Sequence, residues 1–123
     1  MDTTRVLIVD NKTLTRRGIS LLIEQQEDLK VVGEFDCTPD IREKVDEARP
    51  DVILIDVDPS DPTIFDVINV LSDSSEKTYV LALSEEDDLV VVHRALQSGA
   101  SGYLLKDASV EELYSAIRTV RSG

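Results

Sequence analysis

Four largely apolar runs of this chain each end at a polar side chain, and this pattern constrains the fold more than any other feature. Uninterrupted apolar runs are typical of parallel strands that helices cover on both faces. The carboxyl ends of such strands meet at one edge of the sheet, where α/β proteins keep their ligand sites. We therefore expect these polar groups to share one pocket, suited to a divalent cation and a phosphoryl group. They are Asp10 after residues 5–9, Asp56 after 52–55, Ser84 after 80–83 and Lys106 after 103–105.

Stretches with helical periodicity alternate with the strand-like runs along the whole chain. The expected helices cover 14–25, 39–49, 63–71, 86–97 and 110–120, and the expected strands cover 5–9, 31–35, 51–55, 79–83 and 102–105. Thr13 is the expected N-cap of the first helix, and Ser109 with Glu112 forms a capping box before the last one. Five strands alternating with five helices predict one α/β domain, residues 1–123, built on a doubly wound five-stranded parallel sheet.

The helix expected over residues 86–97 carries an apolar stripe at three- and four-residue spacing. Such a stripe normally faces the core. Its members are Leu89, Val92, His93 and Leu96. We expect His93 to be a packing or interface residue and not a ligand.

The composition is that of a soluble globular protein without an internal disulfide. Hydrophobic residues make up 41% of the 123 positions, and no apolar run approaches the roughly 20 residues of a membrane span. The formal net charge of −12 opposes binding to nucleic acid backbones. Cys37 is the one cysteine, and we expect an inert loop thiol. The first residues do not form a signal peptide, so we expect a cytoplasmic protein. The charge and the short apolar runs predict that it binds neither nucleic acid nor membranes directly.

Several segments resemble a known family. The segments are VLIVD, RPDVILID, GASGYLLKDAS and EELYSAIRTV. Together they are similar to the receiver domains of two-component response regulators, and the last two resemble the NarL/FixJ (LuxR-type) subfamily. The resemblance implies a flavodoxin-like receiver fold without enzymatic activity of its own. It favours the N-terminal fragment of a longer transcriptional regulator, whose helix-turn-helix output domain lies outside residues 1–123, over the alternative of a single-domain receiver.

The resemblance assigns a role to each polar residue at the strand ends. Asp56 resembles the phosphoacceptor, which takes a phosphoryl group from a histidine kinase. Ser84 and Lys106 occupy the positions that bind phosphoryl oxygens, and Tyr103 occupies the position of an aromatic switch. The positions that hold Mg²⁺ in the family are occupied by Asp10, Asn11, Asp56 and Asp58.

Two helices are the expected contact surface for partners. They cover residues 86–97 and 110–120 and flank the last strand. We expect this face to bind a second copy of the chain or a C-terminal output domain.

The chain also departs from the family pattern. Asn11 stands where the family has a second acid, and a neutral amide is expected to weaken Mg²⁺ binding. Pro59, Ser60 and Ile64 replace the usual Met, Pro and Gly of the loop after the phosphoacceptor, which predicts a reshaped loop. These changes keep open an alternative function, a degenerate receiver that acts as an interaction or dimerisation module without phosphorylation.

Other interpretations of single residues also stay open. The segment 56–60 resembles the nucleophile motif of haloacid-dehalogenase-type phosphatases, but the further metal-binding acids of those enzymes are represented only by Asp107. Asp10 and Ser84 could instead cap the helices that follow them. Lys106 could be a plain surface lysine, and Asp56 could be a turn residue.

Overall fold

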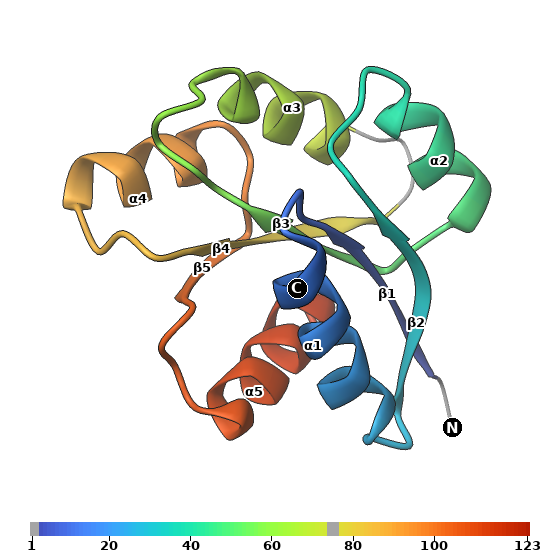
Figure 1. Ribbon diagram of the computed structural model, residues 1–123. Coiled ribbons are helices and arrows are strands. Elements are labelled where there is room, and N and C mark those ends of the chain that lie inside the picture. Colours follow the sequence, from blue (N-terminus) through green and yellow to red (C-terminus); the bar gives the residue numbers. More distant parts are fainter. Residues whose placement is uncertain (1–2, 74–76) are drawn as a thin grey trace.

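The computed structural model describes residues 3–73 and 77–123 and has the predicted alternation of strands and helices (Figure 1). The elements are β1 (Thr4–Val9), α1 (Thr13–Glu24), β2 (Leu29–Phe35), α2 (Ile41–Ala48), β3 (Val52–Asp56), α3 (Thr63–Ser72), β4 (Tyr79–Ser84), α4 (Leu89–Gln97), β5 (Gly102–Leu105) and α5 (Val110–Arg121). The predicted α/β class, with five strands and five helices, is confirmed.

The sheet is parallel, and its strand order places the site. The order is β2-β1-β3-β4-β5, so the chain moves to one side after β1 and crosses back to the other side at β3. Parallel pairing aligns Val9 of β1 with Ile55 of β3, which brings the ends of these strands together. In doubly wound sheets, the point where the strand order reverses is where ligands bind. Asp10 follows β1 and Asp56 ends β3, so both acids lie at this switch point.

Helices cover both faces of the sheet and explain why the strands are apolar on both faces. Figure 1 shows α1 and α5 on one side and α2, α3 and α4 on the other. Along β1, Val6 and Ile8 belong to the core beneath α1 and α5, whereas Leu7 and Val9 belong to the core beneath α2 and α3. This alternation follows the two-residue period of a strand. All four side chains are at most 1% exposed.

Three helix starts differ from the prediction: α1 begins one residue earlier, and α2 and α4 begin later. Thr13 is the first residue of α1 and not its N-cap; Lys12 precedes the helix, without a side-chain capping bond. Helix α2 begins at Ile41 instead of residue 39, and α4 begins at Leu89 instead of residue 86. The late start of α4 has a local cause, because Asp88 has extended backbone angles and its side chain accepts a hydrogen bond from the Val90 N–H.

The packing face of α4 also differs from the predicted one. Leu89 is 81% exposed, and His93 and Leu96 are also exposed. The helix packs instead through Val91 and Ala95, where the small alanine is fully buried. Both stripes have helical periodicity, so spacing alone could not distinguish the inner one from the outer one.

Helix α5 begins as predicted. The Ser109 Oγ accepts a hydrogen bond from the Glu112 N–H, and the Glu112 carboxylate accepts one from the Ser109 N–H, which confirms the capping box. Within the described residues, no helix is long and apolar enough to cross a membrane.

Candidate functional site

A lysine joins the two acids at the switch point. Lys106 follows β5, and its Nζ lies 2.6 Å from Asp56 Oδ1 and 3.1 Å from Asp10 Oδ2. The Asp10 side chain is 2% exposed and the Lys106 side chain 10% exposed, so little water screens the pairs. Because the three groups come from the ends of β1, β3 and β5, only the folded sheet brings them together.

The environment of Lys106 favours its charged form. Burial opposes the charge, but the hydrogen bonds and negative charges of Asp56 and Asp10 outweigh burial, and the pKa of Lys106 is raised. A raised folded-state pKa means that the pairs contribute their full stability below the ordinary pKa of lysine, and that this stability is lost as the pH rises through the raised value. Lys106 is therefore a permanent cation between two acids near neutral pH and not a plain surface lysine.

Ser84 is fully buried at the end of β4, next to the acids. Its Oγ accepts a hydrogen bond from the Glu86 N–H at 3.0 Å, and its carbonyl oxygen accepts one from the Lys106 N–H at 2.9 Å. A hydroxyl that accepts one bond still has a proton to donate. Ser84 does not cap α4, since that helix begins five residues later with Asp88 as its cap. The role of this hydroxyl in binding a phosphoryl oxygen stays a prediction.

The two carboxylate oxygens of Asp10 have different partners, and Lys12, not Asp10, is the N-cap of α1. Asp10 Oδ2 pairs with Lys106, while Asp10 Oδ1 accepts a hydrogen bond at 2.8 Å from the N–H of Lys12, the residue before α1. One oxygen therefore orders the start of α1, and the other faces the site.

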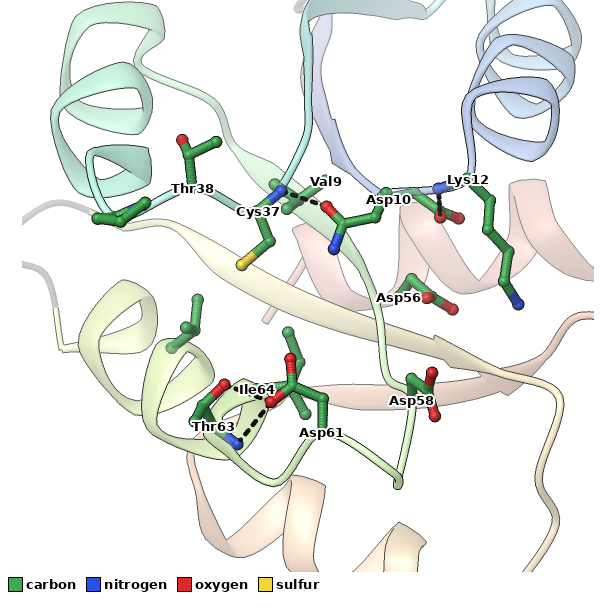
Figure 2. A pocket seen from close by; sticks show the side chains of 13 residues that line it. Val9, Asp10, Lys12, Cys37, Thr38, Asp56, Asp58, Asp61, Thr63 and Ile64 are labelled. Carbon is green, nitrogen blue, oxygen red and sulfur yellow. Dashed lines mark hydrogen bonds between the residues drawn. The ribbon is translucent and has the colours of Figure 1, made fainter.

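Asn11 lines the cavity that holds the two acids, and its side chain is bound to the loop after β2. Its Oδ1 accepts a hydrogen bond at 2.7 Å from the N–H of Cys37, in the loop after β2; this bond is the dashed line at Cys37 in Figure 2. The amide oxygen predicted to contact a metal is therefore used to fasten two loops together. Burial, followed by the charge of Asp61, raises the pKa of the Cys37 thiol, which keeps the thiol protonated.

Asp58 belongs to a tight turn, as expected for a reshaped loop. Its Oδ1 accepts hydrogen bonds from both the N–H and the Oγ of Ser60. The Ser60 hydroxyl is the main reason that the pKa of Asp58 is lowered. The carbonyl of Asp58, which was the predicted metal ligand, accepts a hydrogen bond from the Asp61 N–H at 3.0 Å. Pro59 suits the second position of such a turn. Both polar groups of Asp58 thus have partners within the loop.

The donor set fits Mg²⁺ through two carboxylates. Mg²⁺ is commonly held by one or two carboxylates together with phosphate oxygens, and Asp10 and Asp56 supply such a pair. Over residues 3–73 and 77–123, no three His, Cys, Asp or Glu side chains are grouped so that they could hold a metal. The Asn11 amide oxygen and Asp58 Oδ1 already accept hydrogen bonds, and the part of these two residues in holding a metal stays a prediction.

Tyr103 links β5 to the loop after Ser84. Its hydroxyl donates a hydrogen bond of 2.7 Å to the carbonyl of Glu86, and its half-buried ring packs against the core beneath α3 and α4. The tyrosine therefore contacts the same loop that donates to Ser84. Its role as a switch stays a prediction.

Two site residues were missed from the sequence. Lys12 lines the cavity around Asp56. Its place two residues after Asp10, in the loop that follows β1, could have marked it as a site residue. Arg16 of α1 donates a 2.7 Å hydrogen bond to the Asp10 carbonyl and pairs with Asp36 after β2. Nothing in the spacing of Arg16 marked it, because its contact depends on how α1 is seated on the sheet.

Comparison with known proteins identifies the family. The family model described as "Response regulator receiver domain" matches residues 6–118. This chain is a response-regulator receiver domain. Its relatives indicate the NarL/FixJ type, as the sequence predicted. Receiver domains are generally non-enzymatic signal transducers that bind Mg²⁺ at their acidic pocket.

Relatives of known sequence or structure resemble this chain in sequence and in fold. The receiver domain is 37% identical over 121 residues to the response regulator GacA of Pseudomonas aeruginosa, covering 97% of this chain and 56% of that protein. It is 34% identical over 120 residues to the oxygen regulatory protein NreC of Staphylococcus epidermidis, covering 97% and 55%. The receiver domain of NarL from Mycobacterium tuberculosis has a TM-score of 0.88 and 31% identity, over 100% of this chain and 99% of that one. The receiver domain thus spans about half the length of these curated relatives.

Lys106→Met tests the central contact. Without metal, we expect the free energy of unfolding to fall by about 1–3 kcal/mol, because Asp10 and Asp56 lose the cation that compensates their charges. Added Mg²⁺ should restore part of the loss, since it binds the acids of the folded state. Urea unfolding with and without Mg²⁺ measures both effects. Lys30→Met, which removes an exposed lysine of β2, is the control, and equal stability of the two variants would contradict the account.

Proposed function

We propose that this receiver accepts a phosphoryl group on Asp56 from a histidine kinase and thereby controls a transcriptional output. The observation that carries the proposal is the contact of Lys106 with both Asp10 and Asp56 at the switch point of the sheet. A carboxylate next to a second acid, a buried hydroxyl and a lysine has every group that phosphoryl transfer needs. That reaction depends mainly on positioning and on charge neutralisation.

The residues divide the work of the transfer. An oxygen of Asp56 attacks phosphorus of the phosphohistidine; the P–N bond breaks, its electron pair stays on the imidazole nitrogen, and an acyl phosphate forms. Lys106 pairs with one phosphoryl oxygen, and the Ser84 hydroxyl donates to another. The Asp10 carboxylate would help to bind the Mg²⁺ ion. When bound, Mg²⁺ supplies positive charge to the phosphoryl oxygens.

Phosphorylation by a small donor tests the acceptor. With acetyl phosphate and Mg²⁺, we expect one phosphoryl group per chain, on Asp56, measured by intact mass and peptide mapping. Asp56→Asn should abolish it because the amide is a poor nucleophile. Asp66→Asn removes an exposed acid of α3 and should leave the modification unchanged. A phosphoryl group on another residue would contradict the assignment.

We propose that Asn11 makes the affinity for Mg²⁺ low. Asn11 contributes no negative charge, and its amide oxygen is bound to the Cys37 N–H, so the cation would be held mainly by the carboxylates of Asp10 and Asp56. The reduced set supports a weak site and not the loss of one.

Asn11→Asp should restore affinity. We expect about a tenfold lower Mg²⁺ concentration for half-maximal thermal stabilisation, since one more carboxylate attracts the cation. Without Mg²⁺ the variant should melt at a lower temperature, because three neighbouring carboxylates repel one another. A Mg²⁺ titration by thermal shift, with Asp66→Asn as the control, measures both. Unchanged Mg²⁺ affinity would show that position 11 does not govern the metal.

We propose that the exposed face of α4, together with β5 and α5, is the output surface. Leu89, Val90 and Leu96 are 81%, 72% and 44% exposed, and Tyr103 connects this region to the loop after Ser84. Large apolar side chains gathered on one helix are costly to leave in water and mark an interaction surface. A phosphoryl group that accepts a hydrogen bond from Ser84 would alter the position of the following loop, to which Tyr103 is bonded. This would shift the equilibrium toward chains that can bind a partner.

Leu89→Ser should weaken phosphorylation-dependent self-association. We expect the dissociation constant to rise about tenfold, because a leucine anchor at an interface contributes on the order of 1–2 kcal/mol. Analytical ultracentrifugation of the phosphorylated protein measures it. Leu21→Ser, at a 61% exposed leucine of α1, is the matched control. A larger effect at Leu21 than at Leu89 would assign the surface to α1.

A degenerate receiver is the second candidate function. The observation that favours it is that an oxygen of Asn11 is bound to the Cys37 N–H and an oxygen of Asp58 is bound within its own turn. In that case Asp56 would stay unmodified at saturating acetyl phosphate and Mg²⁺, while the α4 surface would still associate.

We also propose that residues 1–123 belong to a longer cytoplasmic regulator. Curated relatives extend to almost twice the length of the match, and the subfamily resemblance implies a helix-turn-helix output domain. DNA binding would belong to that domain, because a net charge of −12 disfavours contact between this domain and phosphate backbones.

A further inference from the structure

A second lysine lies beside the phosphoacceptor. Figure 2 shows the Lys12 side chain extending from the start of α1 toward the side of the pocket where Asp56 and Asp58 lie. There it lines a small cavity of about 90 Å³. The other residues of this cavity are Asp56, Val57, Asp58, Pro59, Ser84, Glu85 and Glu86. Among these residues, all within the described part of the chain, Lys12 is the only cationic side chain.

The Lys12 ammonium is weakly engaged. Its one ion pair within the described residues is with Glu85, at 3.7 Å from Nζ to Oε2, and the two side chains are 51% and 70% exposed. Exposed pairs at such a distance contribute little to stability. The ammonium can therefore exchange Glu85 for a stronger anion at low cost.

Asn11 and Lys12 both make the net charge of the pocket less negative. Asn11 removes one negative charge from the acidic pocket, and its amide is held by the Cys37 N–H. Lys12 adds one positive charge on the wall where Asp56 and Ser84 meet. Lys106 is already paired with Asp10 and Asp56, whereas Lys12 has an exposed, weaker partner, so Lys12 can meet an incoming anion in addition to Lys106. Together the two residues reduce the attraction for Mg²⁺ and increase the attraction for a phosphoryl group.

We propose that Lys12 is a second phosphoryl-binding cation, which contacts the phosphodonor and the phosphoryl group on Asp56 and supplies part of the charge that a fuller acidic site would draw from Mg²⁺. The proposal rests on the proposed function of Asp56 as acceptor. The chemical class of the ligand is a phosphoryl anion. Glu85 is the counter-ion that Lys12 leaves when the anion binds.

The first experiment compares rates of phosphorylation by acetyl phosphate. We expect Lys12→Gln to react about fivefold more slowly at saturating Mg²⁺, because an exposed charge contributes up to about 1 kcal/mol. Lys12→Arg, which keeps the charge, should retain most of the rate. Lys30→Gln removes the same charge from an exposed position of β2 and should react like the original protein. The difference between the Gln variants should shrink in high salt, which screens an exposed cation.

The second experiment measures anion binding without any reaction. Inorganic phosphate is titrated into Asp56→Asn protein, in which the acceptor no longer repels the anion, and backbone amide shifts of residues 12 and 84 are followed by NMR. We expect saturable shifts at both residues, and loss of these shifts when Lys12→Gln is added. Thermal unfolding of each variant shows whether the fold is intact.

The outcomes separate the two proposals. If the original protein is phosphorylated on Asp56 but Lys12→Gln matches Lys30→Gln in rate and in phosphate binding, the role of Lys12 is overturned while the acceptor function stands. If no variant is phosphorylated, the acceptor function fails, and the titration alone decides about Lys12. Phosphate shifts that depend on Lys12 would then support the anion site, and shifts that do not depend on it, or no shifts at all, would overturn it.

Discussion

The contact of Lys106 with Asp10 and Asp56 is the constraint on which the site depends. Two acids at neighbouring strand ends repel each other, and burial strengthens that repulsion because little water screens it. Lys106, which follows the edge strand β5, supplies the compensating positive charge. The strand order β2-β1-β3-β4-β5 is what lets residues 10, 56 and 106 meet. The same geometry prepares the pocket for a phosphoryl group, whose oxygens can take over the partners of the acids.

Around this centre the chain has redistributed charge. Polar groups around the site bond to neighbouring backbone: Asn11 accepts a hydrogen bond from the Cys37 N–H, Arg16 of α1 donates one to the Asp10 carbonyl, and Asp58 closes a turn in its own loop. These bonds order the pocket but leave fewer oxygens for a cation. Lys12 follows Asn11 in the same loop and lies beside Asp56, and its ion pair with Glu85 is exposed. The proposed weak metal site and the proposed second phosphoryl-binding cation would both follow from the unusual sequence of this loop.

The fold could be predicted closely, and the errors have specific causes. Strand β5 has the predicted bounds, because Gly102 and Lys106 mark the two ends of a short apolar run. Helix α4 was placed three residues early and packed on the wrong side. The acids before it do not extend the helix because Asp88 caps it, and the small Ala95 brings the helix close to the core while Leu89 stays outside. Periodicity gives the presence of an amphipathic helix, but the sheet and α3 determine which stripe is buried.

The sequence by itself determined the alternation of elements, the strand ends and therefore the set of polar residues at one edge of the sheet. These features are local: they follow from apolar runs, caps and turns between near neighbours in the chain. Tertiary structure decided the partner of each polar group. Whether Asn11 faces a metal or the Cys37 N–H, and whether Lys12 points to solvent or toward Asp56, depends on loops that are distant in sequence and adjacent in space. Hydrogen-bond partners are set by angstrom-scale distances between such loops, and no spacing along one chain encodes those distances.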